Sequence, residues 1–267
     1  MSLTSDLFER FKPALGSSST ESTYILGQEK GYVVHYVPFD YVCAKARLVL
    51  VGITPGPKQM KCSRAVAQRL LSSPAADLDI LAEITRSCAF VGMRDRINEM
   101  MDHFGIPRCI GVTSASLLWS SSLAHFYPTS ILPNAVFKSG KYFSGPFSAV
   151  LDTPLLRNQF EDVFIPSIRN LNKQVLYVGM GPVVDEALRW CASNGVITDR
   201  QILGYFPHAS GISGSQFAYF LRKKRLSDLK PRDPVRHRAR DLDAAYEQIK
   251  SNLEALFPGP MDKPQAS

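Results

Sequence analysis

The stretch RLVLVGITPGP at residues 47–57 decides the fold, because it runs from an apolar segment straight into a tight turn. Residues 47–54 show no polar alternation, which is typical of a parallel strand covered on both faces. Three further runs have the same character, at residues 109–117, 174–181 and 201–207. We predict that these four segments are strands of one sheet.

Segments with apolar residues at helical spacing lie between these runs, at residues 63–72, 77–89, 94–104, 155–171 and 183–193. Strand and helix in alternation indicate right-handed crossovers. The sequence therefore predicts a three-layer α/β/α fold with a central four-stranded, mainly parallel sheet. Residues 31–43 are expected to add a hairpin or an edge strand, and residues 121–154 to form a long functional loop.

We expect residues 1–240 to form a single domain, with its core at about 45–226. A C-terminal amphipathic helix at residues 241–257 and a flexible tail to residue 267 follow. With 45% hydrophobic and 21% charged residues, the composition excludes disordered, collagen-like and coiled-coil chains.

The cysteines and the apolar runs bear on the compartment. No run approaches the roughly 20 apolar residues that cross a bilayer, and the N-terminus lacks the pattern of a secretory signal. The five scattered cysteines contain no C-x-x-C pair and are expected to be reduced, mostly buried thiols, with no metal and no cofactor. We predict a cytoplasmic monomer, associated with the nucleoid if the source is prokaryotic, and no membrane partner.

The charge is concentrated in one segment. Residues 221–240 hold nine Lys or Arg against two Asp, a net +7 that equals the net charge of the whole chain. Such a segment is typical of a surface that binds polyanions, and nucleic acid is the obvious partner. The alternative is a solvated basic surface without a specific ligand.

Two segments stand out at the carboxyl ends of predicted strands, where sheets of this kind bind ligands. The first, G-I-T-P-G-P at 52–57, is a tight turn whose backbone can approach a ligand, or simply a strand-to-helix connection. The second, H-A-S-G-I-S at 208–213, places a histidine, hydroxyls and N–H groups at a helix start, which suits phosphate. Alternatively, Ser213 is only an N-cap and His208 an ordinary surface histidine.

Together the two segments resemble the signature motifs of the uracil-DNA glycosylase superfamily. In that superfamily the first motif has the form G-x-(Asp/Asn/Glu)-P-G and the second H-P-S-(G/P)-x-S. Their order and spacing and the surrounding α/β pattern also agree, over roughly residues 45–226. The resemblance implies an enzyme that flips one base out of DNA and hydrolyses its N-glycosidic bond, leaving an abasic site.

The resemblance also implies a role for each matched residue. As catalytic residues, His208 stabilises the leaving base and Thr54 orients water. The base pocket is expected to include Gly52, Ile53 and Ser114. Single- or double-stranded DNA is expected to contact Pro55, Gly56, Ser210, Gly211, Ile212, Ser213, Arg222, Lys223, Lys224 and Arg225, with Ile212 filling the hole left by the flipped base.

Two departures from the family pattern shape the expected substrate. Thr54 stands where members carry Asp, Asn or Glu, and losing a general base typically costs about 10²–10⁴ in rate. The family's uracil-reading Asn is absent from residues 111–116, where Ser114 offers only one hydrogen bond. We hypothesise a modified or damaged pyrimidine other than plain uracil. The aromatic ring that stacks on the flipped base could belong to any of six residues: Phe126, Tyr127, Phe137, Tyr142, Phe143 and Phe147.

Two alternatives come from other classes of function. A nucleic-acid-binding protein that kept the fold and lost or weakened the chemistry is favoured by Thr54 and disfavoured by His208. A hydrolase of free nucleosides is disfavoured by the basic segment, because a neutral nucleoside needs no such surface.

Overall fold

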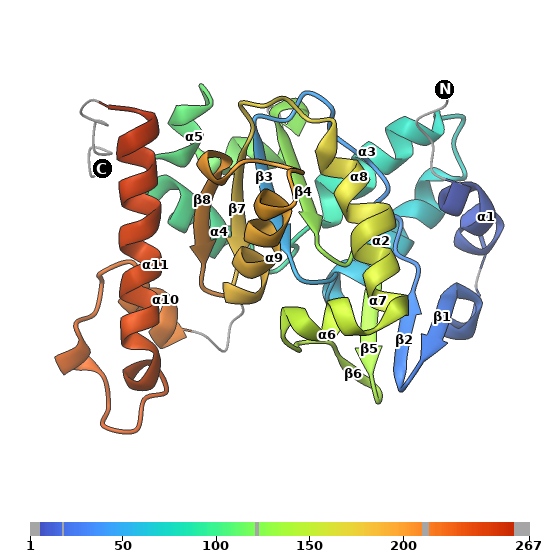
Figure 1. The fold of residues 1–267 in the computed structure, drawn as a ribbon. Helices are drawn as coiled ribbons and strands as arrows, with labels where there is room; N and C mark the ends of the chain where they lie inside the picture. Colours follow the sequence, from blue (N-terminus) through green and yellow to red (C-terminus); the bar gives the residue numbers. More distant parts are fainter. Residues whose placement is uncertain (1–5, 18, 121–122, 210–213, 259–267) are drawn as a thin grey trace.

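The computed structural model describes residues 6–17, 19–120, 123–209 and 214–258 (Figure 1). Its central sheet consists of four parallel strands in the order β4-β3-β7-β8. These are β3 (Leu48–Gly52), β4 (Phe126–Ser130), β7 (Leu176–Met180) and β8 (Ile202–Phe206). The predicted parallel sheet is confirmed, and three of its four strands lie where the sequence placed them.

Side chains of β3 alternate between two cores, one on each face of the sheet. Leu48 and Leu50 pack into one apolar cluster, whereas Val49 and Val51 pack into the other, and all four are fully buried. A strand buried on both faces needs no polar alternation, which is why its sequence reads as one continuous apolar run.

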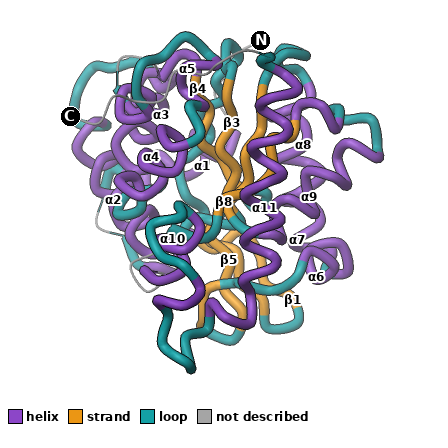
Figure 2. The backbone as a smooth tube through the Cα atoms, turned by 90° about the vertical axis from the view of Figure 1, so that its left-hand side faces the viewer, coloured by secondary structure: helices purple, strands orange, loops and turns teal. Residues whose placement is uncertain are grey.

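Helices cover both faces of the sheet, as Figure 2 shows, and the three-layer α/β/α fold is confirmed. The Leu48 face is covered by α4 (Arg94–His103), α5 (Ile106–Cys109), η2 (Ala115–Trp119), α10 (Gly214–Phe220) and α11 (Val235–Leu256). The Val49 face is covered by α6 (Phe147–Asp152), α7 (Pro154–Asn158), the π-helical η4 (Gln159–Phe164), α8 (Ile165–Arg169) and α9 (Pro182–Ser193).

A second, antiparallel sheet lies beside the N-terminal helices. Its order is β1-β2-β5-β6, formed by β1 (Ile25–Glu29), β2 (Tyr32–His35), β5 (Ala135–Lys138) and β6 (Lys141–Tyr142). The expected hairpin at residues 31–43 thus belongs to a separate sheet. A third apolar cluster joins α1 (Asp6–Leu15), α2 (Pro57–Leu70), α3 (Asp77–Cys88) and η1 (Glu21–Tyr24). Three short 3-10 turns complete the described elements: η3 (Leu123–His125), η5 (Asp199–Gln201) and η7 (Leu226–Asp228).

The predicted strand at residues 109–117 is wrong. This segment contains the end of α5, a turn at Gly111 with a φ of 78°, and the start of η2. The fourth parallel strand is β4, inside the stretch expected to be a long loop, and β5, β6 and α6 also lie there. Pro128 in the middle of β4 argued against a strand, but β4 is at the edge of the sheet, where a missing N–H is tolerated.

The C-terminal helix starts earlier than the sequence indicates. It begins at Val235, so the expected domain boundary at residue 240 falls inside α11. Its apolar side packs into the same cluster as Leu48, and the side-chain amide of Asn252 donates to the carbonyls of Ile202 and Leu203 at 3.1 and 3.2 Å. These bonds cover part of the edge strand β8.

None of the described helices is both long and apolar enough to span a membrane.

Candidate active site

The carboxyl ends of the parallel strands meet at one edge of the central sheet. β4 follows β3 on one side, whereas β7 lies on the other side of β3, so the strand order reverses there. Such a switch point is where open α/β sheets bind ligands. Gly52, Ser130 and His208 all lie at this edge, at or just after the ends of β3, β4 and β8. The first motif and the start of the second, at His208, are therefore brought to the same edge, on strands that lie two strand spacings or about 10 Å apart.

Gly52 allows a close approach that a side chain would make tighter. A Cβ at this position would lie 3.1 Å from Oγ of Ser130 and 3.2 Å from Cζ of Phe90. Phe90 itself has a φ of 54°, a left-handed conformation that a bulky residue rarely adopts. Backbone strain of this kind clusters at functional sites, where the surrounding structure holds it.

Phe90 and Ser130 line a small pocket together with Pro55 and Gln59. Its volume is about 10 Å³, which is room for roughly one water molecule. Pro55, predicted to contact DNA, is buried and forms part of this pocket wall. Ile53 was predicted to line the base pocket, but it packs against the cluster on the opposite face of the sheet.

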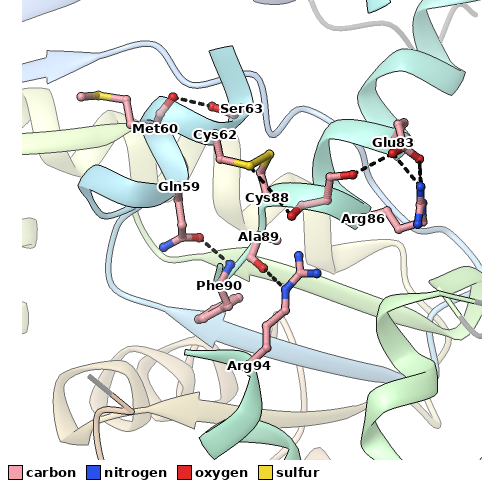
Figure 3. Close-up of a disulfide and its surroundings, with 11 residues drawn as sticks. Gln59, Met60, Cys62, Ser63, Glu83, Arg86, Cys88, Ala89, Phe90 and Arg94 are labelled. Carbon is pink, nitrogen blue, oxygen red and sulfur yellow. Dashed lines mark hydrogen bonds and ion pairs between the residues drawn. A yellow bond between two sulfur atoms is a disulfide. The ribbon is translucent and has the colours of Figure 1, made fainter. Parts of the chain in front are cut away.

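The buried Gln59 holds Phe90 in place. Its Oε1 accepts a hydrogen bond from the backbone N of Phe90 at 2.8 Å (Figure 3). On the other side of this turn, Arg94 donates Nε to the carbonyl of Ala89 at 2.8 Å and lies over the ring of Trp119. Burial lowers the pKa of Arg94 to about 10, so its guanidinium remains charged at neutral pH.

Thr54 makes structural contacts. Its Oγ1 donates to the carbonyl of Asn134 at 2.7 Å and accepts from the backbone N of Val136 at 3.1 Å, which ties the end of β3 to β5. The hydroxyl proton is therefore engaged, and only one lone pair is left for the water that Thr54 was predicted to orient. Gly56, the next motif residue, is the half-buried N-cap of α2.

His208 lies at the predicted edge of the sheet, two residues after β8. Its side chain keeps an exposed surface, yet burial of part of the ring lowers its pKa below the ordinary value of about 6.5. The imidazole is therefore neutral at pH 7, which is the form that can donate an N–H to a leaving base. The rest of this motif, Ser210, Gly211, Ile212 and Ser213, lies outside the described residues.

Ser114 does not line this pocket, and its predicted role rested on the wrong strand. Its Oγ donates to Oδ2 of Asp102 at 3.1 Å and caps η2 by accepting from the backbone N of Ser116. The strand next to β3 ends at Ser130, which therefore occupies the place expected for Ser114.

Sequence reasoning missed Phe90, Gln59 and Ser130. None of the six candidate stacking rings is among the described residues that line the pocket, and Phe126, Tyr127 and Phe147 are buried in the two main cores. The signal for Ser130 was a short β-rich run containing a proline. Phe90 gave no signal, because its left-handed backbone conformation shows only in the structure.

The four predicted DNA-binding cations differ in their partners. Arg222 pairs with Asp243 and with Glu247, the latter at 3.6 Å, and Lys223 pairs with Glu99. Lys224 and Arg225 are exposed and form no ion pair with any described residue. Direct ion pairs thus hold the first two residues of the predicted patch, whereas Lys224 and Arg225 only help to lower the pKa values of nearby carboxylates, Asp228 and Asp233. The last two residues are therefore the stronger candidates for phosphate contacts.

The expectation that all cysteines are reduced is wrong. Cys62 of α2 and Cys88 of α3 form a disulfide with a Cα–Cα distance of 5.5 Å (Figure 3). They are 26 residues apart, and only the packing of the two helices brings them together. Cys43, Cys109 and Cys191 form no disulfide and are thiols. Disulfides persist in oxidising compartments and are transient or redox-active in the cytosol, so this bond lends no support to the cytoplasmic prediction.

The described residues contain no group of three or more His, Cys, Asp or Glu side chains that could hold a metal ion.

Comparison with known proteins adds a relative without a stated activity. No protein-family model matches the chain. The chain is 26% identical over 217 residues to a Bacillus subtilis (strain 168) protein described as uncharacterized protein YoxB. The aligned residues cover 79% of this chain and 85% of that protein. The function is therefore argued from the geometry at the carboxyl ends of the strands.

Proposed function

We propose that this protein is a DNA glycosylase that takes a flipped base into the pocket beside Phe90 and hydrolyses its N-glycosidic bond. The observation that carries the proposal is the position of the Gly52 turn and His208 on either side of the switch point of one parallel sheet. The same two segments resemble the signature motifs of the uracil-DNA glycosylase superfamily.

His208 has the protonation state that the reaction needs. When the bond between the sugar C1′ and the base nitrogen breaks, the electron pair leaves with the base. Water adds its oxygen to C1′, and the proton that this water loses ends on the released base. A neutral imidazole at this edge donates N–H to the developing negative charge, and in a partly buried site such a donor is worth several kcal/mol.

The pocket has to open before it admits a base, because its volume of about 10 Å³ holds about one water molecule. Gln59 is the side chain whose movement has a direct consequence. When its Oε1 leaves the backbone N of Phe90, that N–H is free to donate to a base carbonyl. The amide of Gln59 and the hydroxyl of Ser130 then offer both donors and acceptors, which keeps a modified or damaged pyrimidine as the expected target.

Base release from defined oligonucleotides tests this function. Single- and double-stranded oligonucleotides that carry uracil, hypoxanthine or modified cytosines are incubated with excess protein, and alkali then cuts the strand at abasic sites. We expect cleavage at one of these bases with the unchanged protein and none with His208→Ala. Release of uracil alone from the whole panel would contradict the expected preference for another base.

A second candidate is a nucleic-acid-binding protein of the same fold without the chemistry. The engaged hydroxyl of Thr54 and the small pocket favour it. This candidate predicts that DNA binds in a salt-dependent way, that no base is released, and that His208→Ala binds DNA as tightly as the unchanged protein does.

A further inference from the structure

A large cavity lies at the opposite end of the sheet from the candidate active site. It has a volume of about 870 Å³. Its lining includes Arg47, His125, Val175 and Gln201, each of which immediately precedes one of the four parallel strands. This cavity, the amino-end pocket, therefore opens at the amino ends of the strands. In Figure 1 this is the end where α5 and the last turns of α11 lie.

The lining of the amino-end pocket is strongly positive. Among the described residues, it contains the cations Lys45, Arg47, Lys173 and Arg200 and no Asp or Glu. Ion pairs neutralise cations elsewhere in the described structure, such as Arg64, Arg189 and Arg222. None of the four pocket cations forms an ion pair with a described residue. Like charges around a concave surface raise the local positive potential, and an anion relieves their mutual repulsion.

The neighbouring acidic residue does not neutralise this charge. Asp199 precedes Arg200, but its carboxylate lies 3.9 Å from the guanidinium of Arg189 and does not line the pocket. One of the four cations is also held in place, because Nη1 of Arg47 donates to the carbonyl of Ile110 at 2.7 Å. A guanidinium fixed by one bond keeps further donors in a planar fork that suits phosphate oxygens.

The frame of the pocket is rigid. Oε1 of the buried Gln201 accepts from the backbone N of Thr198 at 2.9 Å, and its Nε2 donates to the carbonyl of Val175 at 3.2 Å. These bonds tie the chain before β8 to the chain before β7. The cavity thus exists before any ligand binds, as is usual for small-molecule sites.

Apolar side chains form the remaining wall. Leu256 and Phe257 at the end of α11 are half-buried, and Ile110 is buried. A free inorganic anion would make no apolar contact with this wall, whereas a ligand with both a phosphate and a ring can pack its ring against it. The volume is in the range of about 300–1,000 Å³ that drug-sized ligands occupy.

We propose that the amino-end pocket is a second ligand site that binds a nucleotide. Its phosphates contact Lys45, Arg47, Lys173 and Arg200, and its ring packs against Phe257. The site is separate from the glycosylase proposal, since it lies at the other end of the sheet and shares no residue with the candidate active site.

Calorimetric titration of the full chain with ADP tests the site, with orthophosphate and adenosine as partial ligands. We expect ADP to bind at least about tenfold more tightly than either partial ligand, because neither fills both parts of the pocket. Lys173→Gln/Arg200→Gln is expected to weaken ADP binding by about tenfold or more, since hydrogen bonds to charged groups are removed. Phe257→Ala is expected to weaken ADP and to leave orthophosphate unchanged.

A matched control separates a site from general attraction to positive charge. Lys230→Gln/Arg232→Gln removes the same charge from two other exposed residues that lie outside the pocket. We expect this variant and His208→Ala to bind ADP like the unchanged protein. The proposal is overturned if ADP produces no binding heat, if orthophosphate binds as tightly as ADP, or if both double variants weaken ADP equally. It is also overturned if a single-stranded oligonucleotide displaces ADP from the pocket at lower concentration than ADP itself, since the pocket then belongs to a nucleic-acid surface.

Discussion

Gly52 is the residue at which the sheet and the candidate active site meet. It ends β3, pairs in register with Ser130 and lies against the ring of Phe90. Its place could be predicted from the sequence, since a glycine after an apolar run indicates a close approach of the backbone. Its neighbours could not, because Phe90 and Ser130 are 38 and 78 residues away along the chain.

Replacing Gly52 tests this contact. Gly52→Ala is expected to lower the free energy of unfolding by about 1–3 kcal/mol, because its methyl group forces the ring of Phe90 to shift. Urea unfolding measures this change. Gly16→Ala is the control, since a Cβ there meets only backbone oxygens at 3.5 and 3.8 Å, and we expect a change below about 0.5 kcal/mol.

Thr54 carries a second prediction at this scale. Thr54→Val removes the bonds to Asn134 and Val136 and is expected to cost about 1–3 kcal/mol of unfolding free energy. Thr54→Ser keeps the hydroxyl and is expected to retain most of the stability and the base-release activity. Equal stability of the two variants in urea would show that these hydrogen bonds do not support the end of β3.

The lowered pKa of His208 predicts how stability depends on pH. Between the folded pKa and about 6.5 the unfolded chain binds more protons, so the contribution of His208 falls as the pH falls. His35 and His103 also have pKa values lowered by burial. Both histidines are present in the unchanged protein and in His208→Ala, so their contributions cancel when the two proteins are compared. We expect the unchanged protein to lose more unfolding free energy than His208→Ala between about pH 7 and pH 5. If the unfolding free energy of the unchanged protein relative to His208→Ala instead rises as the pH falls from about 7 to 5, the sign is opposite and the assignment is contradicted.

At the scale of elements, the disulfide and Gln59 both tie α2 to the end of α3. Cys88 is two residues before Phe90, and Gln59 is three residues before Cys62 (Figure 3). The turn that holds Phe90 is therefore fixed by a covalent bond and a buried hydrogen bond. Scattered cysteines without a C-x-x-C pair hid this link, because helix packing and not local spacing creates it.

Counting thiols checks the disulfide. Denatured protein without a reductant is expected to alkylate at three cysteines, and at all five after reduction. Cys62→Ser/Cys88→Ser is expected to lose about 3 kcal/mol of unfolding free energy, given a loop of 26 residues. Cys109→Ser, which changes a cysteine outside the disulfide, is the control and is expected to change stability far less. Alkylation at five sites without a reductant would show that the bond is absent.

Strand prediction succeeded where both faces of a strand are buried and failed at the edge of the sheet. The runs that became β3, β7 and β8 are continuous and apolar, so period and composition agree. Residues 109–117 have similar composition, but Gly111 turns with a positive φ and ends any extended run. β4 holds Pro128, which an edge strand accepts and a sequence pattern counts against.

At the scale of the whole molecule, the sequence predicts where the basic residues lie better than it predicts which of them are free of ion pairs with carboxylates. The sequence showed that the net charge resides in residues 221–240, but ion pairs with Glu99, Asp243 and Glu247 are visible only once the helices are packed. The positive lining of the amino-end pocket was missed, because its four cations come from three segments that are far apart in the sequence: Lys45 with Arg47, Lys173, and Arg200.

Salt dependence of DNA binding tests which cations lie against phosphate. Lys224→Gln/Arg225→Gln is expected to weaken binding and to lower the slope of log K against log salt by about two, roughly one for each phosphate that is no longer neutralised. Arg222→Gln/Lys223→Gln is expected to have a smaller effect, since carboxylates already offset those charges. Filter-binding titrations over a series of salt concentrations measure both slopes. A larger effect of the second pair would contradict this ranking.

The most direct measurement of the central claim is chromatographic detection of free base from an oligonucleotide panel, with DNA binding measured on the same samples. The account predicts that the unchanged protein releases one modified or damaged base in a single turnover. It also predicts that His208→Ala releases none while its affinity for DNA stays the same. Equal release by both proteins would contradict the role of His208, and binding without release of any base would contradict the glycosylase itself.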